Sequence, residues 1–261
     1  MARRQTIRFT RYGGSMNHVS TVVSYCSLDE PFLLPIIQQA SLFSNEIVIA
    51  AADHLYNGEL ENHDALLAAK KVFPDMRVVL YEWSDGKPPR FWHNSARWEG
   101  FLRASSDWIL FLDGDEIPDG ELMKKFLSED LLLDGYGFEC YWYFREPTYQ
   151  ATTRSQAGIM LRRKHIQYDF IFSEHERAEH RLHPELRVAE HVTLSGRPLV
   201  HHYSWTRSKD VLLRKVSSWA HRDERPWRSI IEEEFSHPFR GTEAIHGFSY
   251  AHVENQFKIE I

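Results

Sequence analysis

The chain has 261 residues with 43% hydrophobic content, enough to bury the core of one ordinary domain without disulfides. Its formal net charge of -6 gives no reason to expect nucleic acid as a partner. The two cysteines, Cys26 and Cys140, favour a reducing, cytoplasmic compartment. No apolar stretch approaches the roughly 20 residues of a transmembrane helix, so we expect a soluble protein without a transmembrane segment.

The N-terminus differs in composition from the rest of the chain. Four arginines precede the first acidic residue, and Gly13-Gly14-Ser15 follows them without the apolar core of a signal peptide. This composition predicts a flexible basic tail over residues 1–17. We expect residues 18–261 to form a single domain.

Strand and helix patterns alternate through the first half of the chain. Strands are expected over residues 19–25, 46–52, 76–83 and 108–112, and helices over residues 32–43, 65–72 and 91–105. Asp29-Glu30-Pro31 supplies the start of the first helix, and residues 84–90 are expected to form a loop. The alternation predicts an α/β, Rossmann-like fold, a mostly parallel sheet with flanking helices that binds ligands at the carboxyl ends of its strands.

The pattern changes beyond Gly120. We expect a helix through residue 133, an aromatic strand over residues 136–144, a short strand near residues 159–161 and a helix over residues 208–221. This predicts a C-terminal helical or irregular segment. The aromatic run Tyr141-Trp142-Tyr143-Phe144 is interpreted as core or as a stacking face. The basic run Arg162-Arg163-Lys164 is interpreted as a solvated patch or a phosphate contact.

Carboxylates follow the fourth strand directly. Asp113-Gly114-Asp115-Glu116 would deliver hard oxygen ligands for a divalent cation to the edge of the sheet. The alternative is turn chemistry, since Asp-Gly is common in turns and Asp119 is placed to cap the next helix. Asp29 and Asp53 follow the first two strands, where a nucleotide would lie, or they are cap and turn residues.

The context of this cluster resembles a known family. Residues 94–100 read Asn-Ser-Ala-Arg-Trp-Glu-Gly, and residues 107–116 contain a strand followed by Asp113-Gly114-Asp115. This is similar to the GT-A fold nucleotide-sugar glycosyltransferases of the family 2 type, in which an Ala-Arg-Asn-x-Gly helix precedes an Asp-x-Asp metal motif. The resemblance implies that Asp115 binds the metal, that Asp113 binds metal or ribose, and that Arg97 faces the nucleotide. It places the acidic residue of the second strand at Ala51 rather than Asp53.

Two later segments extend the resemblance. Residues 173–176, Ser-Glu-His-Glu, resemble the acceptor-side motif of lipopolysaccharide-core-type enzymes, and residues 202–205, His-Tyr-Ser-Trp, resemble their late His-Tyr-x-aromatic segment. A weaker similarity links residues 115–118 and 202–205 to the bisecting N-acetylglucosaminyltransferase family. The resemblance implies Glu176 as the catalytic base, with Glu174, Asp169 and Glu190 as alternates. It also implies His202 as a metal ligand, with His201 as the alternate, because neighbouring strand residues face opposite sides.

Together these features predict a metal-dependent glycosyltransferase that uses Mn²⁺ or Mg²⁺ and a nucleotide-sugar donor, a UDP-sugar first of all. The resemblance implies inversion at the anomeric carbon. Residues 18–119 would form the nucleotide-sugar-binding half, and residues 120–261 the acceptor-side half, for a glycan, lipid-linked or protein-linked acceptor. The alternatives are a non-catalytic nucleotide- or glycan-binding module of the same fold and a nucleotidyltransferase. The latter usually carries a Gly-rich phosphate loop that Tyr25-Cys26-Ser27-Leu28 lacks.

Overall fold

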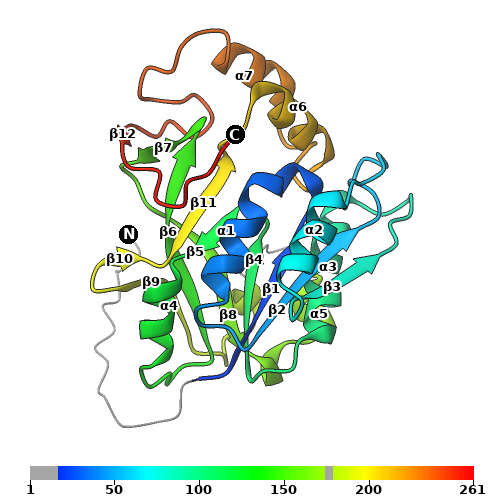
Figure 1. Ribbon diagram of the computed structural model, residues 1–261, viewed down its shortest axis with the longest axis vertical. Coiled ribbons are helices and arrows are strands. Elements are labelled where there is room, and N and C mark those ends of the chain that lie inside the picture. Colours follow the sequence, from blue (N-terminus) through cyan, green and yellow to red (C-terminus); the bar gives the residue numbers. More distant parts are fainter. Residues whose placement is uncertain (1–16, 174–178) are drawn as a thin grey trace.

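The computed structural model describes residues 17–173 and 179–261 (Figure 1). Within these residues twelve strands form one sheet, flanked by helices. The main path of the sheet runs β10-β9-β6-β8-β4-β1-β2-β3, while β5, β7, β11 and β12 pair off this path. Across the described part of the chain, no helix is both long enough and apolar enough to cross a membrane.

The first half forms the parallel part of the sheet. Its elements are β1 (Val19–Ser24), η1 (Ser27–Asp29), α1 (Glu30–Ala40), β2 (Glu46–Ala52), α2 (Asp64–Val72), β3 (Arg77–Tyr81), α3 (Pro89–Arg103) and β4 (Trp108–Asp113). Strand β1 runs parallel to β2 and to β4, and β2 runs parallel to β3. The predicted α/β order is confirmed, with ends shifted by a few residues. Helix α1 starts at Glu30 because Pro31 fits the first helical turn.

The second half adds more strands than the sequence pattern predicts. Its elements are β5 (Glu116–Pro118), α4 (Gly120–Leu127), β6 (Gly135–Phe144), β7 (Glu146–Ala151), β8 (Ser155–Arg162), η2 (Arg163–His165), α5 (Tyr168–Ile171), η3 (Glu179–Leu182), β9 (Val188–Leu194), β10 (Arg197–Pro198), β11 (Val200–Trp205), α6 (Lys209–Ser218), α7 (Trp227–Glu234) and β12 (Tyr250–His252). Strands β9 and β11 both run parallel to β6, and β8 is antiparallel to β4 and β6. Two strands were expected in this half, and the further strands extend the sheet, while α6, α7 and the stretches around them form the predicted helical or irregular C-terminal segment.

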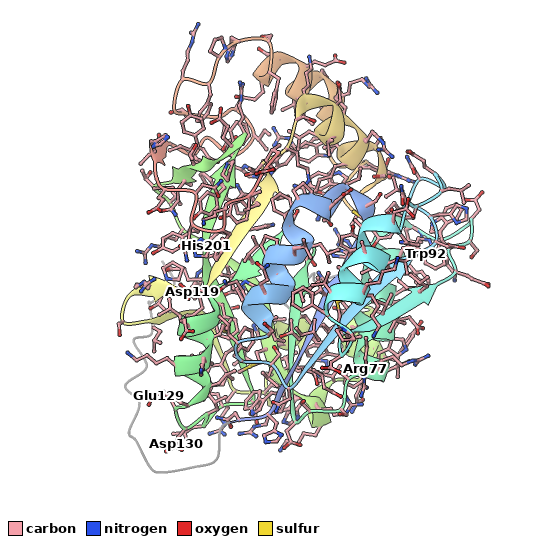
Figure 2. The ribbon with its side chains drawn as sticks, in the orientation of Figure 1. Arg77, Trp92, Asp119, Glu129, Asp130 and His201 are labelled. Atoms are coloured by element: carbon pink, nitrogen blue, oxygen red, sulfur yellow. The ribbon has the colours of Figure 1, made fainter. Side chains whose placement is uncertain are left out.

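Helix α4 is shorter than expected and begins at a capped residue. Asp119, labelled in Figure 2, precedes it, and its Oδ1 accepts a hydrogen bond from Leu122 N at 3.1 Å. The helix ends at Leu127 rather than continuing to residue 133. Asp119 is therefore a cap residue, as its position before the helix suggested.

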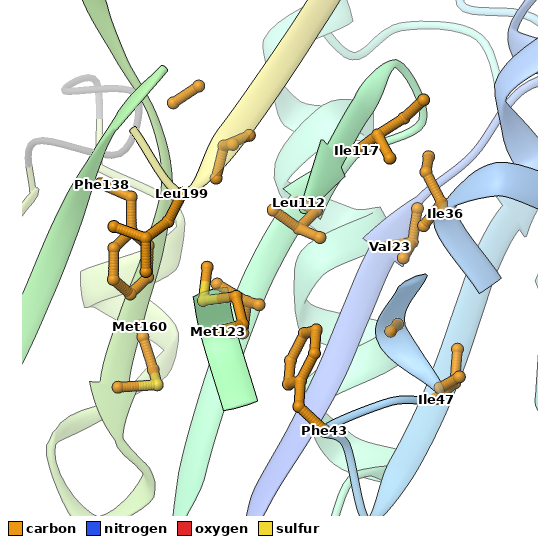
Figure 3. Close-up of a cluster of buried hydrophobic side chains, with 14 of the residues drawn as sticks. Val23, Ile36, Phe43, Ile47, Leu112, Ile117, Met123, Phe138, Met160 and Leu199 are labelled. Atoms are coloured by element: carbon orange, nitrogen blue, oxygen red, sulfur yellow. The ribbon is translucent and has the colours of Figure 1, made fainter. Parts of the chain in front are cut away.

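The core occupies both faces of the parallel strands. On one face Val23 and Leu112 pack with Ile36 of α1, a cluster drawn in Figure 3. On the opposite face Val22 packs against α3, where a Cβ added to Gly100 would lie 2.4 Å from Val22 Cγ1. Helix α3 can therefore approach β1 this closely only with glycine at position 100.

A third cluster joins the C-terminal helices to the far end of the sheet. Phe144 of β6 and Trp205 of β11 pack there against side chains of α6 and α7, including Leu212 and Ile231. The large apolar side chains of this cluster hold α6 and α7 over the carboxyl end of β11, and Figure 1 shows these helices at that end of the molecule.

Candidate active site at the carboxyl edge of the parallel strands

A cavity of about 520 Å³ opens at the carboxyl ends of the parallel strands. Ser24, Ala52 and Asp113, the last residues of β1, β2 and β4, line one side of it. Trp142 of β6 and Lys215 of α6 line the other side. The cavity therefore lies between the parallel half of the sheet and the C-terminal elements, at the edge where α/β sheets bind ligands.

The turn after β4 is fixed by a hydrogen bond from Asp113 N to Glu116 and by its close contact with Asp29. The buried Glu116 accepts a hydrogen bond from Asp113 N on Oε2, at 3.0 Å. A Cβ added to Gly114 would lie 2.5 Å from Asp29 Oδ2. Only glycine at position 114 therefore lets the Asp113–Asp115 turn lie directly against Asp29.

Asp115 is paired with two cations and an imidazole inside the cavity. Lys215 Nζ donates to its Oδ2 at 2.6 Å and Arg207 Nη2 donates to the same oxygen at 3.0 Å. His202 Nε2 lies 3.3 Å from its Oδ1. Burial by itself would raise the pKa of Asp115, but Lys215, His202 and Arg207 outweigh it and hold this pKa well below its usual range.

Arg207 links the ends of two parallel strands. Its guanidinium is buried and pairs with Asp29 as well as with Asp115. Its Nε donates to the carbonyl of Leu28 at 3.0 Å and its Nη1 to that of Tyr203 at 3.0 Å. Burial raises the pKa of Asp29, and the charge of Asp115 adds to this rise, while Arg207 opposes it. The arginine therefore compensates two buried carboxylates that would otherwise repel each other.

Asp113 is held from the side of α3. Its Oδ1 lies 3.0 Å from His93 Nε2 and 3.3 Å from Arg97 Nη2. Arg97 is buried, and its Nη1 also donates to Asn94 Oδ1 at 3.2 Å. His93 and Asp113 line the cavity, whereas Arg97 does not. The basic side chain expected to face a nucleotide thus lies against Asp113.

Strand register brings His202 into the cavity. Strand β11 runs between β5 and β6, so His202 lies opposite Glu116 on one side and Trp142 on the other. The backbone N–H of Tyr203 donates to the carbonyl of Asp115 at 2.9 Å, which ties β11 to the acidic turn. The His202 Nδ1 atom is buried and has no hydrogen-bond partner among the described residues.

His201 points to the other side of the same strand. Its Nδ1 lies 2.8 Å from the hydroxyl of Tyr143, and its side chain is buried beside Phe257 (Figure 2 labels His201). Burial lowers the pKa of His201 to about 3, and Arg197 adds to this effect. The alternation of side chains along β11 thus separates a cavity histidine from a core histidine.

The remaining predicted site residues lie elsewhere. Asp53 is not among the residues that line the cavity, and its Oδ1 accepts from Trp83 N at 2.7 Å in the connection that follows β2. Asp169 is exposed on α5, and Glu190 on β9 pairs with His180 at 3.1 Å. Glu174 and Glu176 lie outside the described residues.

The basic run after β8 also lies outside the cavity lining. Arg162 Nη2 donates to the carbonyl of Leu131 at 2.8 Å, and Arg163 Nη1 donates to that of Ala104 at 2.6 Å. Arg162 also covers the ring of Trp108 at 4.3 Å from its centroid. Both arginines therefore bind backbone carbonyls at the amino end of β4.

Several cavity residues were not identified from the sequence. Lys215 and Trp219 come from the region of α6, while Trp227 and His246 come from the segment after residue 222, which carries no recognisable motif. The sequence did contain one indication that cations would be needed near the acidic turn. Three carboxylates within the four residues 113–116 require positive partners when buried, and Arg207 and Lys215 supply them for Asp115.

The donor set at Asp115 suits a divalent cation that is also bound by its substrate. Asp115 Oδ1 and His202 Nε2 are 3.3 Å apart, close to the ~3 Å between adjacent ligands of an octahedral Mg²⁺-sized ion. Among the described residues no group of three His, Cys, Asp or Glu side chains could hold a metal ion. Phosphate oxygens and water would therefore complete the coordination, as is usual for Mg²⁺ at phosphate sites.

Neither the protein-family models nor the curated proteins contain a match to this chain. Among solved structures, a mannosyltransferase from Pyrobaculum calidifontis in complex with GDP-Man and Mn²⁺ is 12% identical, with a TM-score of 0.49, 88% of this chain covered and 72% of that chain. Glucosyl-3-phosphoglycerate synthase from Mycobacterium tuberculosis is 15% identical with a TM-score of 0.37. That match covers 60% of this chain and 64% of the synthase.

A 4-diphosphocytidyl-2C-methyl-D-erythritol synthase is also similar, at 8% identity and a TM-score of 0.46, with 77% of this chain and 98% of that chain covered. The solved structures that align with this chain thus include glycosyltransferases and a 4-diphosphocytidyl-2C-methyl-D-erythritol synthase. At these identities and TM-scores the likeness concerns the fold alone, and the activity has to be argued from the cavity.

Proposed function

We propose that this chain is a metal-dependent glycosyltransferase that moves a sugar from a nucleoside-diphosphate donor to a hydroxyl acceptor, with inversion. The observation that carries the proposal is the pairing of Asp115 with His202 at the end of β4, inside a cavity of about 520 Å³. The sequence resemblance supports the same reading. A UDP-sugar is the first donor to test.

The charge of the cavity supports a requirement for a metal. Among the described residues, its lining carries the carboxylates of Asp29, Glu61, Asp113, Asp115 and Glu224 and two Lys or Arg side chains, Lys215 and Arg181. A diphosphate adds negative charge to this surface, so a cation has to accompany it. When bound, a divalent ion would stabilise the charge that grows on the departing diphosphate.

The protein side chains would act around this leaving group. Asp115 and His202 would hold the ion, and Lys215, next to Asp115, would contribute a second positive charge near the diphosphate. Asp113 would face the donor from a position fixed by His93 and Arg97. In transfer, the acceptor oxygen bonds to the anomeric carbon, the bond from that carbon to the diphosphate oxygen breaks, and the acceptor proton passes to a carboxylate.

We infer from the sequence resemblance that this carboxylate is Glu176. Glu176→Gln is expected to keep the affinity for nucleotide sugar and to lower the transfer rate by on the order of 10² to 10⁴. Titration of donor and turnover with acceptor measure the two quantities separately. Full activity in this variant would move the search to Glu174, Asp169 or Glu190.

Asp115→Asn tests the metal site. The substitution keeps the shape of the side chain but removes the charge that would bind the cation, so transfer is expected to fall by on the order of 10² to 10³. Turnover at saturating Mn²⁺, recorded with a melting curve, is the measurement. Asp119→Asn is the matched control, because Asp119 is buried and ion-paired with Arg197 outside the cavity lining. Near-normal turnover of a folded Asp115→Asn protein would contradict the proposal.

The products separate the alternative activities. A glycosyltransferase releases a nucleoside diphosphate, whereas a nucleotidyltransferase releases pyrophosphate from a nucleoside triphosphate. A non-catalytic binding module would bind UDP with Mn²⁺ and release neither product. Product analysis with UDP-sugars and with nucleoside triphosphates therefore distinguishes the three functions.

A further inference from the structure

A continuous aromatic wall extends from the candidate metal ligand to the outer side of the cavity. We define it by the cavity-lining residues Trp142, Trp205, Trp219, Trp227 and His246. The ring of Trp142 lies 4.4 Å from that of His202 and 5.2 Å from that of His246, between centroids. Trp205 continues the wall, 5.8 Å from His246 and 5.5 Å from Trp219. The wall therefore begins where transfer would take place.

Three tryptophans of this wall keep their N–H groups out of reach of the cavity. The Nε1 atoms of Trp142 and Trp219 are buried, so an oxygen of a bound molecule does not reach them. The Nε1 of Trp227 donates to the carbonyl of His221 at 2.8 Å. Trp142 and Trp219 are half-buried as whole residues, so their ring carbons line the cavity. The wall therefore offers apolar ring surface to a bound molecule.

Within the described lining of the cavity, no lysine or arginine is left without an acidic partner. The only lysine and arginine among its described lining residues are already paired, Lys215 with Asp115 at 2.6 Å and Arg181 with Glu190 at 2.7 Å. At the aromatic end, His221 lies 2.6 Å from Glu224 and His246 lies 3.4 Å from Glu243. Negative groups in a ligand would therefore meet carboxylates rather than cations.

We propose that the aromatic wall is the acceptor subsite and that it takes a neutral carbohydrate, whose C–H faces stack on the rings of Trp142 and Trp219. This inference rests on the proposed glycosyltransferase function and names the class of its acceptor. Aromatic rings present apolar faces to the C–H surfaces of a sugar ring. The carboxylates of the lining, such as Glu61 and Glu224, would repel an acidic or phosphorylated acceptor.

Calorimetric titration of the full chain tests the acceptor class. The neutral probes are maltotriose, cellotriose, mannotriose and the N-acetylglucosamine trimer, and the anionic probe of the same length is trigalacturonic acid. Each is titrated with and without UDP and Mn²⁺. We expect at least one neutral trisaccharide to bind, and trigalacturonic acid to bind at least tenfold more weakly. Binding of none of the four neutral trisaccharides, or stronger binding of the anionic one, overturns the proposal.

Single-ring substitutions test the stacking surface. Trp142→Leu and Trp219→Leu keep an apolar side chain and remove the aromatic face, so each is expected to weaken saccharide binding about threefold to tenfold. Trp92→Leu is the matched control, because Trp92 lies on α3 outside the cavity lining (Figure 2). Unchanged saccharide affinity in both cavity variants overturns the assignment of the wall.

The nucleotide titration separates this inference from the proposed function. UDP binding in the presence of Mn²⁺ should be the same in Trp219→Leu as in the wild type, and should be lost in Asp115→Asn. UDP binding without any neutral saccharide binding refutes the subsite and leaves the proposed function standing. Saccharide binding without Mn²⁺-dependent UDP binding supports the subsite and refutes the glycosyltransferase.

Discussion

The two halves of the molecule supply opposite chemistry to one cavity. The parallel half, β1 to β4 with α1 to α3, contributes carboxylates that follow strand ends, such as Asp29 and Asp113. The second half contributes cations, an imidazole and the aromatic wall. The partners Arg207 and Lys215 lie 92 and 100 residues along the chain from Asp115. The acidic edge is thus local in sequence, whereas its charge balance is not.

This difference implies that the acidic edge depends on the second half for its stability. Asp29 and Asp115 are buried and like-charged, and burying them without cations would be strongly unfavourable. Arg207 reaches both from the segment between β11 and α6. Removing a cation or an imidazole of the second half should therefore change the stability of the protein or its affinity for nucleotide. The largest change is expected for the shared arginine.

Arg207→Met should produce the largest change in stability. It leaves two buried carboxylates without their shared cation, and breaking such a pair by removing one partner costs about 3–5 kcal/mol. Urea unfolding of the wild type and the variant at neutral pH measures the difference. The double variant Asp29→Asn/Arg207→Met should recover part of the loss, because Asp115 keeps Lys215 and the charge of Asp29 is gone. A single variant as stable as the wild type would show that the two halves are not coupled through this arginine.

His202→Ala should weaken the Mn²⁺-dependent binding of UDP by about tenfold to a hundredfold, the scale seen when support of a metal site is lost. His201→Ala is the matched control on the same strand, since His201 faces Tyr143 and the core. Isothermal titration of UDP at fixed Mn²⁺ compares the two variants. A larger effect from His201→Ala would reverse the assignment of the two neighbours.

His201 should make stability depend on pH. Because burial lowers its folded pKa to about 3, the unfolded chain, with a histidine pKa near 6.5, binds more protons between these values. Stability therefore rises with pH in this window and falls by about 1.4 kcal/mol per unit as the pH decreases. His201→Gln should remove this contribution, so unfolding free energies measured between pH 6 and pH 4 should give a shallower slope. An unchanged slope would mean that His201 takes up its proton in the folded state.

The sequence predicted the parallel half well because its signals are local. An apolar strand such as β4, buried on both faces, reads as a continuous hydrophobic run, and Pro31 and Asp119 mark where helices begin. Strand β11 was harder to recognise. Its sequence Val-His-His-Tyr-Ser-Trp is fully buried although half of it is polar, because Tyr143 and Asp115 provide partners for its histidines.

The site shows the same division. The acidic turn at Asp113 to Glu116 was recognisable from its position after a buried strand. The contact of Arg97 with Asp113 was not recognisable, because the position of Arg97 on its helix does not show which groups its side chain reaches. The surroundings of Asp53 could not be predicted from the sequence either. Asp53 follows β2 as expected, but its carboxylate accepts from Trp83 N and is not part of the cavity lining.

The sequence by itself determined the order of the parallel strands along the chain, the carboxylates at their ends and the pair of adjacent histidines on one later strand. Only the tertiary structure decided which histidine faces Asp115, which cations neutralise it and which tryptophans line the cavity. The physical reason is that strand ends and caps depend on neighbours a few residues away. Register between β5, β6 and β11, and the placement of α6 over them, depend on packing between residues far apart in the chain.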